Sequence, residues 1–135
     1  MYTKHALSLS DAQQILAAAA QEANDNQWAV AIAVVDDGGH LLAMQRTEAC
    51  APVGSYIAIE KARTAALGRR ETKVYEDMIN AGRTAFLSAP VISATLEGGV
   101  PIIVDNQVIG AVGVSGVKSN EDAQIAKAGV TALSL

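Results

Sequence analysis

Hydrophobic and polar positions alternate along residues 28–46, and this pattern predicts a β-hairpin. In residues 28–35 large apolar residues alternate with alanines, so one face of the strand can fill a core while the other lets a helix approach closely. The sequence DDGG at 36–39 supplies residues that accept positive φ, which favours a tight turn. We therefore expect a return strand from His40 to about Arg46.

Residues 96–119 predict a second hairpin, and glycines flank it on both sides. A β-branched strand over 100–104 leads to a turn at residues 105–107 and to a return strand with valines at alternate positions. Pro101 is tolerable near the start of the strand if its missing N–H faces away from the ladder. Glycines at Gly98, Gly99, Gly110 and Gly113 leave bare backbone, which favours close approach by another segment or a ligand.

Apolar residues recur at helical spacing in the remaining segments. We expect helices over 11–24, 53–67, a shorter stretch after Thr72 that stops near Gly82, and 119–132. The expected end signals are Ser10 with Gln13, Gly68 at the end of the second helix, Thr72, and Ser119 with Asp122. This order predicts a single domain over residues 1–135 that contains both helices and strands (α/β in the broad sense), and more specifically an α+β arrangement. It would have two layers, with two antiparallel hairpins in one sheet and helices on one face, similar to profilin or PAS-like folds.

Composition narrows the function classes. The chain has 135 residues, 50% of them hydrophobic and 18% charged, with a net charge of −4 and no basic tract, which argues against nucleic acid and anionic membranes. It contains no apolar run of about 18 residues. Residues 1–10 lack a signal pattern and Cys50 has no cysteine partner, so we expect a cytoplasmic protein. Abundant alanine and few aromatic residues predict closely packed helices and a core completed by partner subunits.

Two familiar site patterns are absent. Gly110, Gly113 and Gly116 precede Lys118-Ser119, but Val117 separates the last glycine from the lysine, so the Walker phosphate loop is not matched. The histidines, His5 and His40, have no second ligand at metal spacing, which argues against a zinc site.

Several side chains remain candidates for a site. His40, Met44, Cys50 and Tyr56 each carry a side chain of a type that can ligate haem iron. Arg46, Lys61 and Glu97 each border an apolar element, and a lysine with a glutamate can serve proton transfer. Packing or solvation is the simpler explanation for each of these residues taken singly, and for Lys61 it is a surface ion pair.

Five blocks of sequence together resemble the GlcG/HbpS family, which also includes the C-terminal domain of PduO-type proteins. The blocks are VVDDGGHLLAMQR (34–46), KARTAA (61–66), LEGGVPI (96–102), GAVGVSG (110–116), and ED followed by IAKAG (121–129). The similarity covers about residues 9–133 in the family order. The resemblance implies a small domain that assembles into a homo-oligomer, commonly an octamer. It also implies haem binding in some members, with haem degradation linked to an extracellular one.

The resemblance suggests a use for the glycine-rich wall. Gly98 and Gly99 before Pro101, with Arg46 and Lys61 nearby in an assembly, would line a pocket for haem or another anionic ligand. His40 is a further candidate cofactor-binding residue. A second hypothesis is an accessory protein or acid–base enzyme, of isomerase or lyase type, for a small carboxylate or diol-pathway metabolite, with Lys61 and Glu97 as the catalytic pair. A third is a structural or interaction module without a ligand.

Overall fold

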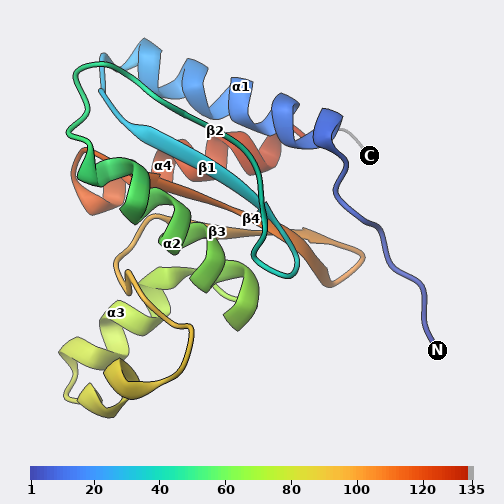
Figure 1. Ribbon diagram of the computed structural model, residues 1–135, viewed down its shortest axis with the longest axis vertical. Helices are drawn as coiled ribbons and strands as arrows, with labels where there is room; N and C mark the ends of the chain where they lie inside the picture. The colour runs from blue at the N-terminus through green and yellow to red at the C-terminus, as the bar shows by residue number, and fades with distance from the viewer. Residues whose placement is uncertain (134–135) are drawn as a thin grey trace.

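Two antiparallel hairpins form one four-stranded sheet in this computed structural model, which describes residues 1–133 (Figure 1). The first hairpin consists of β1 (Ala31–Asp36) and β2 (Leu41–Arg46), and the second of β3 (Gly99–Val104) and β4 (Gln107–Ser115). The strand order is β2-β1-β4-β3, with β1 antiparallel to β4 at the centre. The predicted α+β class and the pair of hairpins in one sheet are confirmed.

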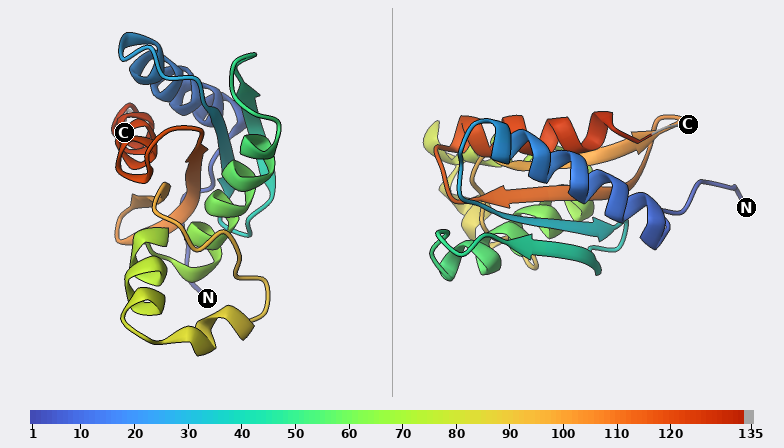
Figure 2. Two further views of the ribbon diagram at one scale, coloured as in Figure 1. Left: turned by 90° about the vertical axis from the view of Figure 1, so that its left-hand side faces the viewer. Right: turned by 90° about the horizontal axis from the view of Figure 1, so that it is seen from above.

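Helices cover both faces of this sheet, so the expectation of helices on one face is wrong. On one face α1 (Leu9–Asp25) and α4 (Ser119–Thr131) lie side by side, and α2 (Val53–Gly68) packs on the other (Figure 2). The physical reason lies in β1, where Ile32 and Val34 face the layer of α1 and α4 while Ala31 and Ala33 face α2. Small side chains on the second face let α2 approach closely.

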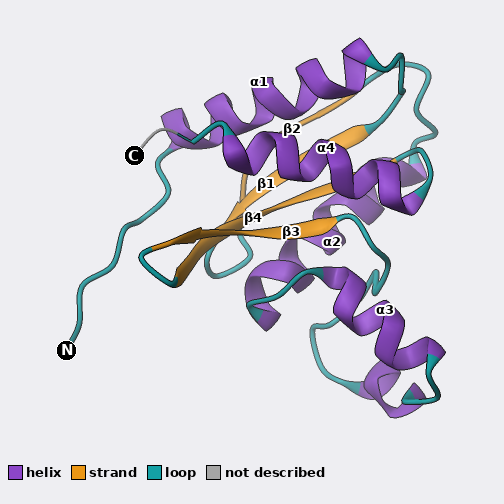
Figure 3. Ribbon diagram, turned by 180° about the vertical axis from the view of Figure 1, so that it is seen from behind, coloured by secondary structure: helices purple, strands orange, loops and turns teal. Residues whose placement is uncertain are grey.

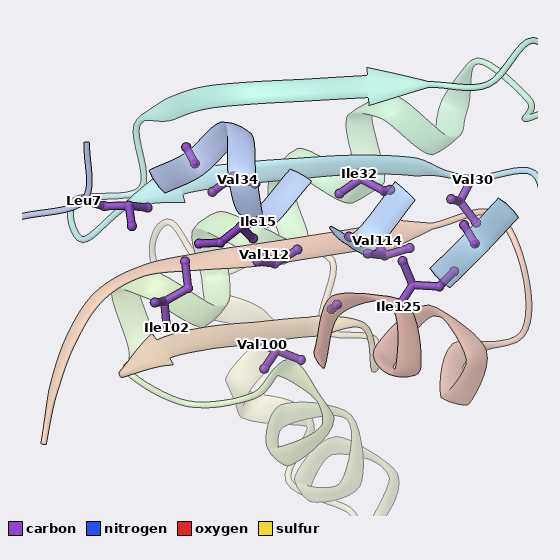
Figure 4. Packing of buried hydrophobic residues seen from close by; sticks show 14 of the residues in the cluster. Leu7, Ile15, Val30, Ile32, Val34, Val100, Ile102, Val112, Val114 and Ile125 are labelled. Carbon is purple, nitrogen blue, oxygen red and sulfur yellow. The ribbon is translucent and has the colours of Figure 1, made fainter. Parts of the chain in front are cut away.

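The larger core lies between the sheet and the α1–α4 layer. Figure 4 shows Ile15 of α1 and Ile125 of α4 directed at the valines and isoleucines of the strands. On the opposite face the contact is much closer. A Cβ atom on Gly113 would lie 2.1 Å from the carbonyl oxygen of Ala58 in α2. Gly113 is therefore required for the packing of α2 on β4.

A smaller unit projects from this body between α2 and β3. It consists of α3 (Thr72–Asn80) and the 3₁₀ helix η1 (Thr84–Ser88), visible from behind in Figure 3. The rings of Tyr75 and Phe86 hold it together, with centroids 5.6 Å apart. The chain then returns through an irregular loop to β3.

The helix ends differ from the predicted ones in detail. Ser8 with Asp11, and not Ser10 with Gln13, forms the capping box of α1. At the end of α2 the left-handed residue is Arg69 and not Gly68. The residue that precedes α3 is Glu71 and not Thr72. At the start of α4 the cap residue is Lys118 and not Ser119, and its N–H donates to Glu121. Within residues 1–133 no helix is long and apolar enough to cross a membrane.

Candidate functional site

The Lys61 side chain is buried, although a lysine in an alanine-rich helix is normally solvated. It is 2% exposed, and its Nζ donates hydrogen bonds to the carbonyl oxygen of Val114 at 2.9 Å and to Asp122 Oδ2 at 3.1 Å. Lys61 belongs to α2 and Asp122 to α4, so the ion pair connects helices on opposite faces of the sheet. It does so at the point where the chain enters β3.

Asp122 is the partner that the sequence analysis missed. It was expected to cap α4, but its Oδ1 accepts the N–H of Val117 at 3.2 Å while Oδ2 receives Lys61. Burial raises the pKa of the Asp122 carboxyl, and the ammonium of Lys61 opposes that rise. A signal existed in the sequence, because Asp122 occupies the inward stripe of α4 together with Ile125, Ala126 and Gly129.

Gly98 and Gly99 make room for this ion pair. A Cβ on Gly98 would lie 2.8 Å from both Lys61 Nζ and the Val114 carbonyl oxygen, and its φ of +133° is a glycine conformation. A Cβ on Gly99 would lie 2.4 Å from the Lys61 carbonyl oxygen, and its N–H donates to Thr72 Oγ1 at 2.8 Å. In a single chain the bare backbone therefore faces Lys61 and Thr72.

Glu97 does not meet Lys61 in the part of the chain that the structure describes. Its own N–H donates to Glu76 Oε2 at 3.2 Å. Its carboxylate contributes to the raised pKa of Lys73, for which the hydrogen bond from Lys73 to Asp77 is the main cause. The structure thus brings Lys61 together with Asp122 and Gly98, but forms no ion pair between the two residues proposed as a catalytic pair.

The candidate cofactor residues lie at different places in one chain. Arg46 ends the edge strand β2, where its Nη1 donates to the Cys50 carbonyl oxygen at 2.6 Å. His40 lies at the opposite end of β2, beside the β1–β2 turn. Gly99 and Pro101 belong to β3, the other edge of the sheet. A pocket containing all of these residues would have to combine more than one chain.

Of the candidate iron ligands, His40 and Tyr56 are exposed. Cys50 is buried, and Met44 packs against the buried apolar residues between the sheet and α2. Tyr56 is 73% exposed on α2. The His40 side chain is 81% exposed, and its Nδ1 lies 3.2 Å from Asp36 Oδ1. Within residues 1–133 no group of three or more histidine, cysteine and acidic side chains could hold a metal ion.

Comparisons with known proteins agree with this architecture. A family model described as "Haem degrading protein HbpS-like" matches residues 7–131. Protein GlcG of Escherichia coli (strain K12) is 63% identical over 115 residues, which are 85% of each chain.

Two solved structures share the fold. A double mutant of Streptomyces reticuli HbpS superposes with a TM-score of 0.88 at 26% identity, covering 100% of this chain and 92% of that one. A crystal structure titled as a PduOC–haem complex gives a TM-score of 0.84 at 28% identity, with 95% of each chain covered.

Proposed function

We propose that this chain, which belongs to the HbpS-like family, binds haem at an exposed surface centred on His40, within a homo-oligomer. Support comes from the family and from the haem complex reported for a structural neighbour. The observation that carries the proposal is the geometry of His40. Its imidazole stands in solvent and is oriented through Nδ1 by the Asp36 carboxylate.

The residues around His40 fit a haem edge. A carboxylate that fixes one ring nitrogen leaves the other, Nε2, available as an iron ligand and strengthens it as a donor. Leu41 and Leu67 are both exposed, and Leu67 and Arg63 pack against Gly39 in the same turn. These leucines offer apolar contact to a porphyrin, and Arg63, which pairs with Glu60 at 2.9 Å, offers a second hydrogen-bonding edge of its guanidinium to a propionate. When bound, haem would supply the iron redox chemistry needed for its own degradation.

A second subunit would complete this site. The surface around His40 is open, whereas a porphyrin buries both of its faces in a stable complex. The exposed apolar side chains Val53 and Tyr56 on α2 support assembly, for which we propose the octamer implied by the family. We also propose that the oligomer acts in the cytoplasm. Lys61 and Glu97 receive no acid–base role here, because Lys61 is committed to Asp122.

A hemin titration of the purified protein, followed by absorbance and size-exclusion chromatography, tests the proposal. We expect a saturable Soret band that co-elutes with an oligomer. The His40→Ala variant should lose it, and His5→Ala, which removes the other histidine of the chain, should retain it. Unaltered binding by His40→Ala, or binding lost in Tyr56→Phe instead, would overturn the assignment to His40. The absence of saturable binding to the wild type would overturn haem binding itself.

Degradation is tested on the loaded protein. Adding ascorbate in air should bleach the Soret band faster for the wild-type complex than for free hemin. An equal rate would remove degradation from the proposal and leave binding unaffected.

A further inference from the structure

We propose that the hollow beneath the N-terminal arm, here called the arm hollow, binds a small organic anion, with Arg69 as its anchor. The arm comprises the residues before α1, and it crosses the tips of both hairpins. Lys4 pairs with Asp37 at the β1–β2 turn, and His5 lies 3.2 Å from Asp105 at the β3–β4 turn. The hollow has a volume of about 480 Å³, and its lining includes Tyr2, Lys4, Arg69, Ile103 and Gln107.

Arg69 occupies a backbone position that favours glycine. It follows the last residue of α2 with a φ of +57°, in the left-handed conformation that commonly ends helices with a glycine. A glycine stands one residue earlier, at Gly68, where a Cβ would lie 2.1 Å from the hydroxyl oxygen of Tyr75. Gly68 is thus explained by packing. The arginine that follows it holds a conformation costly for an L side chain, and such strain is frequent at functional sites.

The guanidinium of Arg69 is held in place and still has free donors. Its Nη1 donates to the carbonyl oxygens of Asp37 at 2.5 Å and Ala66 at 2.8 Å. Within residues 1–133 neither Nε nor Nη2 has a hydrogen-bond partner, and these two atoms form the edge that binds a carboxylate bidentately. Arg69 therefore has a fixed guanidinium whose Nε and Nη2 donors face no partner in the described part of the chain, which is the arrangement of an anion-binding site.

The charges around the arm hollow add up in favour of an anion. Two cations, Lys4 and Arg69, line it, and Asp37 is paired to Lys4. The hydrogen bond from Lys4 is the main cause of the lowered pKa of Asp37, so this carboxylate is ionised and neutralises one of the two cations. Asp105 faces the neighbouring hollow with His5. Arg69 also lowers the pKa of the Asp37 carboxyl, more weakly than Lys4 does, so two cations share one carboxylate and the lining together with Asp37 carries one excess positive charge.

The remaining lining defines the rest of the ligand. Tyr2 and Ile103 provide apolar contact, and the Gln107 amide can bond a hydroxyl or carbonyl group. Volumes of about 300–1,000 Å³ are usual for small-molecule sites, so the hollow accepts more than a two-carbon acid. The chemical class is a monocarboxylate with an apolar body. His40 does not line this hollow, so the inference goes beyond haem binding.

The test uses the full chain without hemin. Binding of benzoate and hexanoate is measured by calorimetry and compared with benzamide and hexanamide, which have the same shape without the charge. We expect saturable millimolar binding of at least one acid and none of its amide. Arg69→Gly should weaken binding by about tenfold or more while the melting temperature stays equal or rises, because glycine accepts the left-handed conformation. The control Arg83→Ala removes the same charge from the α3–η1 unit and should bind like the wild type.

Three outcomes would overturn the proposal. They are equal binding of acid and amide, wild-type affinity in Arg69→Gly, and no saturable binding of either acid. Should Arg69→Gly not fold, Lys4→Met tests the same hollow from the arm, and unchanged affinity there would also overturn it. None of these results depends on the hemin titration, so failure of one proposal is distinguishable from failure of the other.

Discussion

Replacing Lys61 by methionine removes the ammonium group and keeps a side chain of similar length. The carboxylate of Asp122 would then remain buried with the N–H of Val117 but without its cation. Both Lys61 and Asp122 are 2% exposed, so water does not screen the loss. Breaking a buried ion pair on one side costs about 3–5 kcal/mol of unfolding free energy, against about 0–1 kcal/mol for an exposed pair. We expect Lys61→Met to lie in the first range at neutral pH.

The same variant should acquire a steeper pH dependence. Burial already raises the folded-state pKa of Asp122 above 3.8, and Lys61 opposes that rise. Without Lys61 the pKa rises further. Stability linked to a raised pKa is fully present below the unfolded-state pKa and is lost as the pH rises through the folded-state value. The unfolding free energy of Lys61→Met should therefore fall more than that of the wild type from about pH 4 upward.

Urea unfolding followed by circular dichroism measures both effects. The matched control is Lys61→Met combined with Asp122→Asn, which removes both charges and leaves an amide oxygen for the Val117 N–H. It should be more stable than Lys61→Met alone. A loss below about 1 kcal/mol in Lys61→Met, or a double variant no more stable than the single one, would refute the argument. Measurement at mildly acidic pH keeps the experiment possible if Lys61→Met is unfolded at neutral pH.

Three further predictions concern other contacts. Gly113→Ala would drive a Cβ to 2.1 Å from the backbone of α2 and should cost about 3 kcal/mol or more in urea unfolding; a loss below about 1 kcal/mol would mean that α2 can move away without penalty. Thr72→Val leaves the Gly99 N–H without its acceptor and should cost about 1–3 kcal/mol, while Thr72→Ser should recover most of it; equal stability of the two variants would refute the hydrogen bond as the cause. Asp37 has a lowered pKa because Lys4 donates to it, so its stabilisation is present above the unfolded-state pKa and disappears as the pH falls through the lower folded-state value. Asp37→Asn should not show this loss of stability at low pH, which amounts to about 1 kcal/mol at most. Thermal melts above and below the transition test this, and melting temperatures equal to those of the wild type at both pH values would contradict it.

The sequence allowed the hairpins and helices to be predicted because their signals are local. Alternation in β1, the turn residues of both hairpins and the apolar stripe of α2 each depend on neighbours a few positions apart. The arrangement of the helices on the two faces of the sheet was harder to predict from the sequence. The alanines of β1 indicated a close helix on the second face, yet which helix takes which face depends on connections that periodicity does not encode.

The candidate site was predicted less well for the same reason. The sequence indicates Lys61 as a site candidate because it is a polar residue in an apolar helix, and its burial gives that prediction a physical basis. Its partner Asp122 is 61 residues away and resembled a cap. The glycines at 98 and 99 suggested a ligand-binding surface. A glycine indicates only that another group lies close to the backbone, and here those groups belong to the chain itself.

Pro101 has a consequence for how this sheet can grow. Val114 donates to Gly98, so by antiparallel alternation the nitrogens of Gly99, Pro101 and Ile103 point outward from β3. Thr72 already takes the Gly99 N–H, and Pro101 has none to offer. The β3 edge therefore lacks backbone N–H donors that a further strand needs, whereas β2, the other edge strand, contains no proline. Strand-to-strand addition is restricted to β2, and joining two copies there uses up the open edge of both. Such growth ends at a closed pair instead of continuing into a fibre.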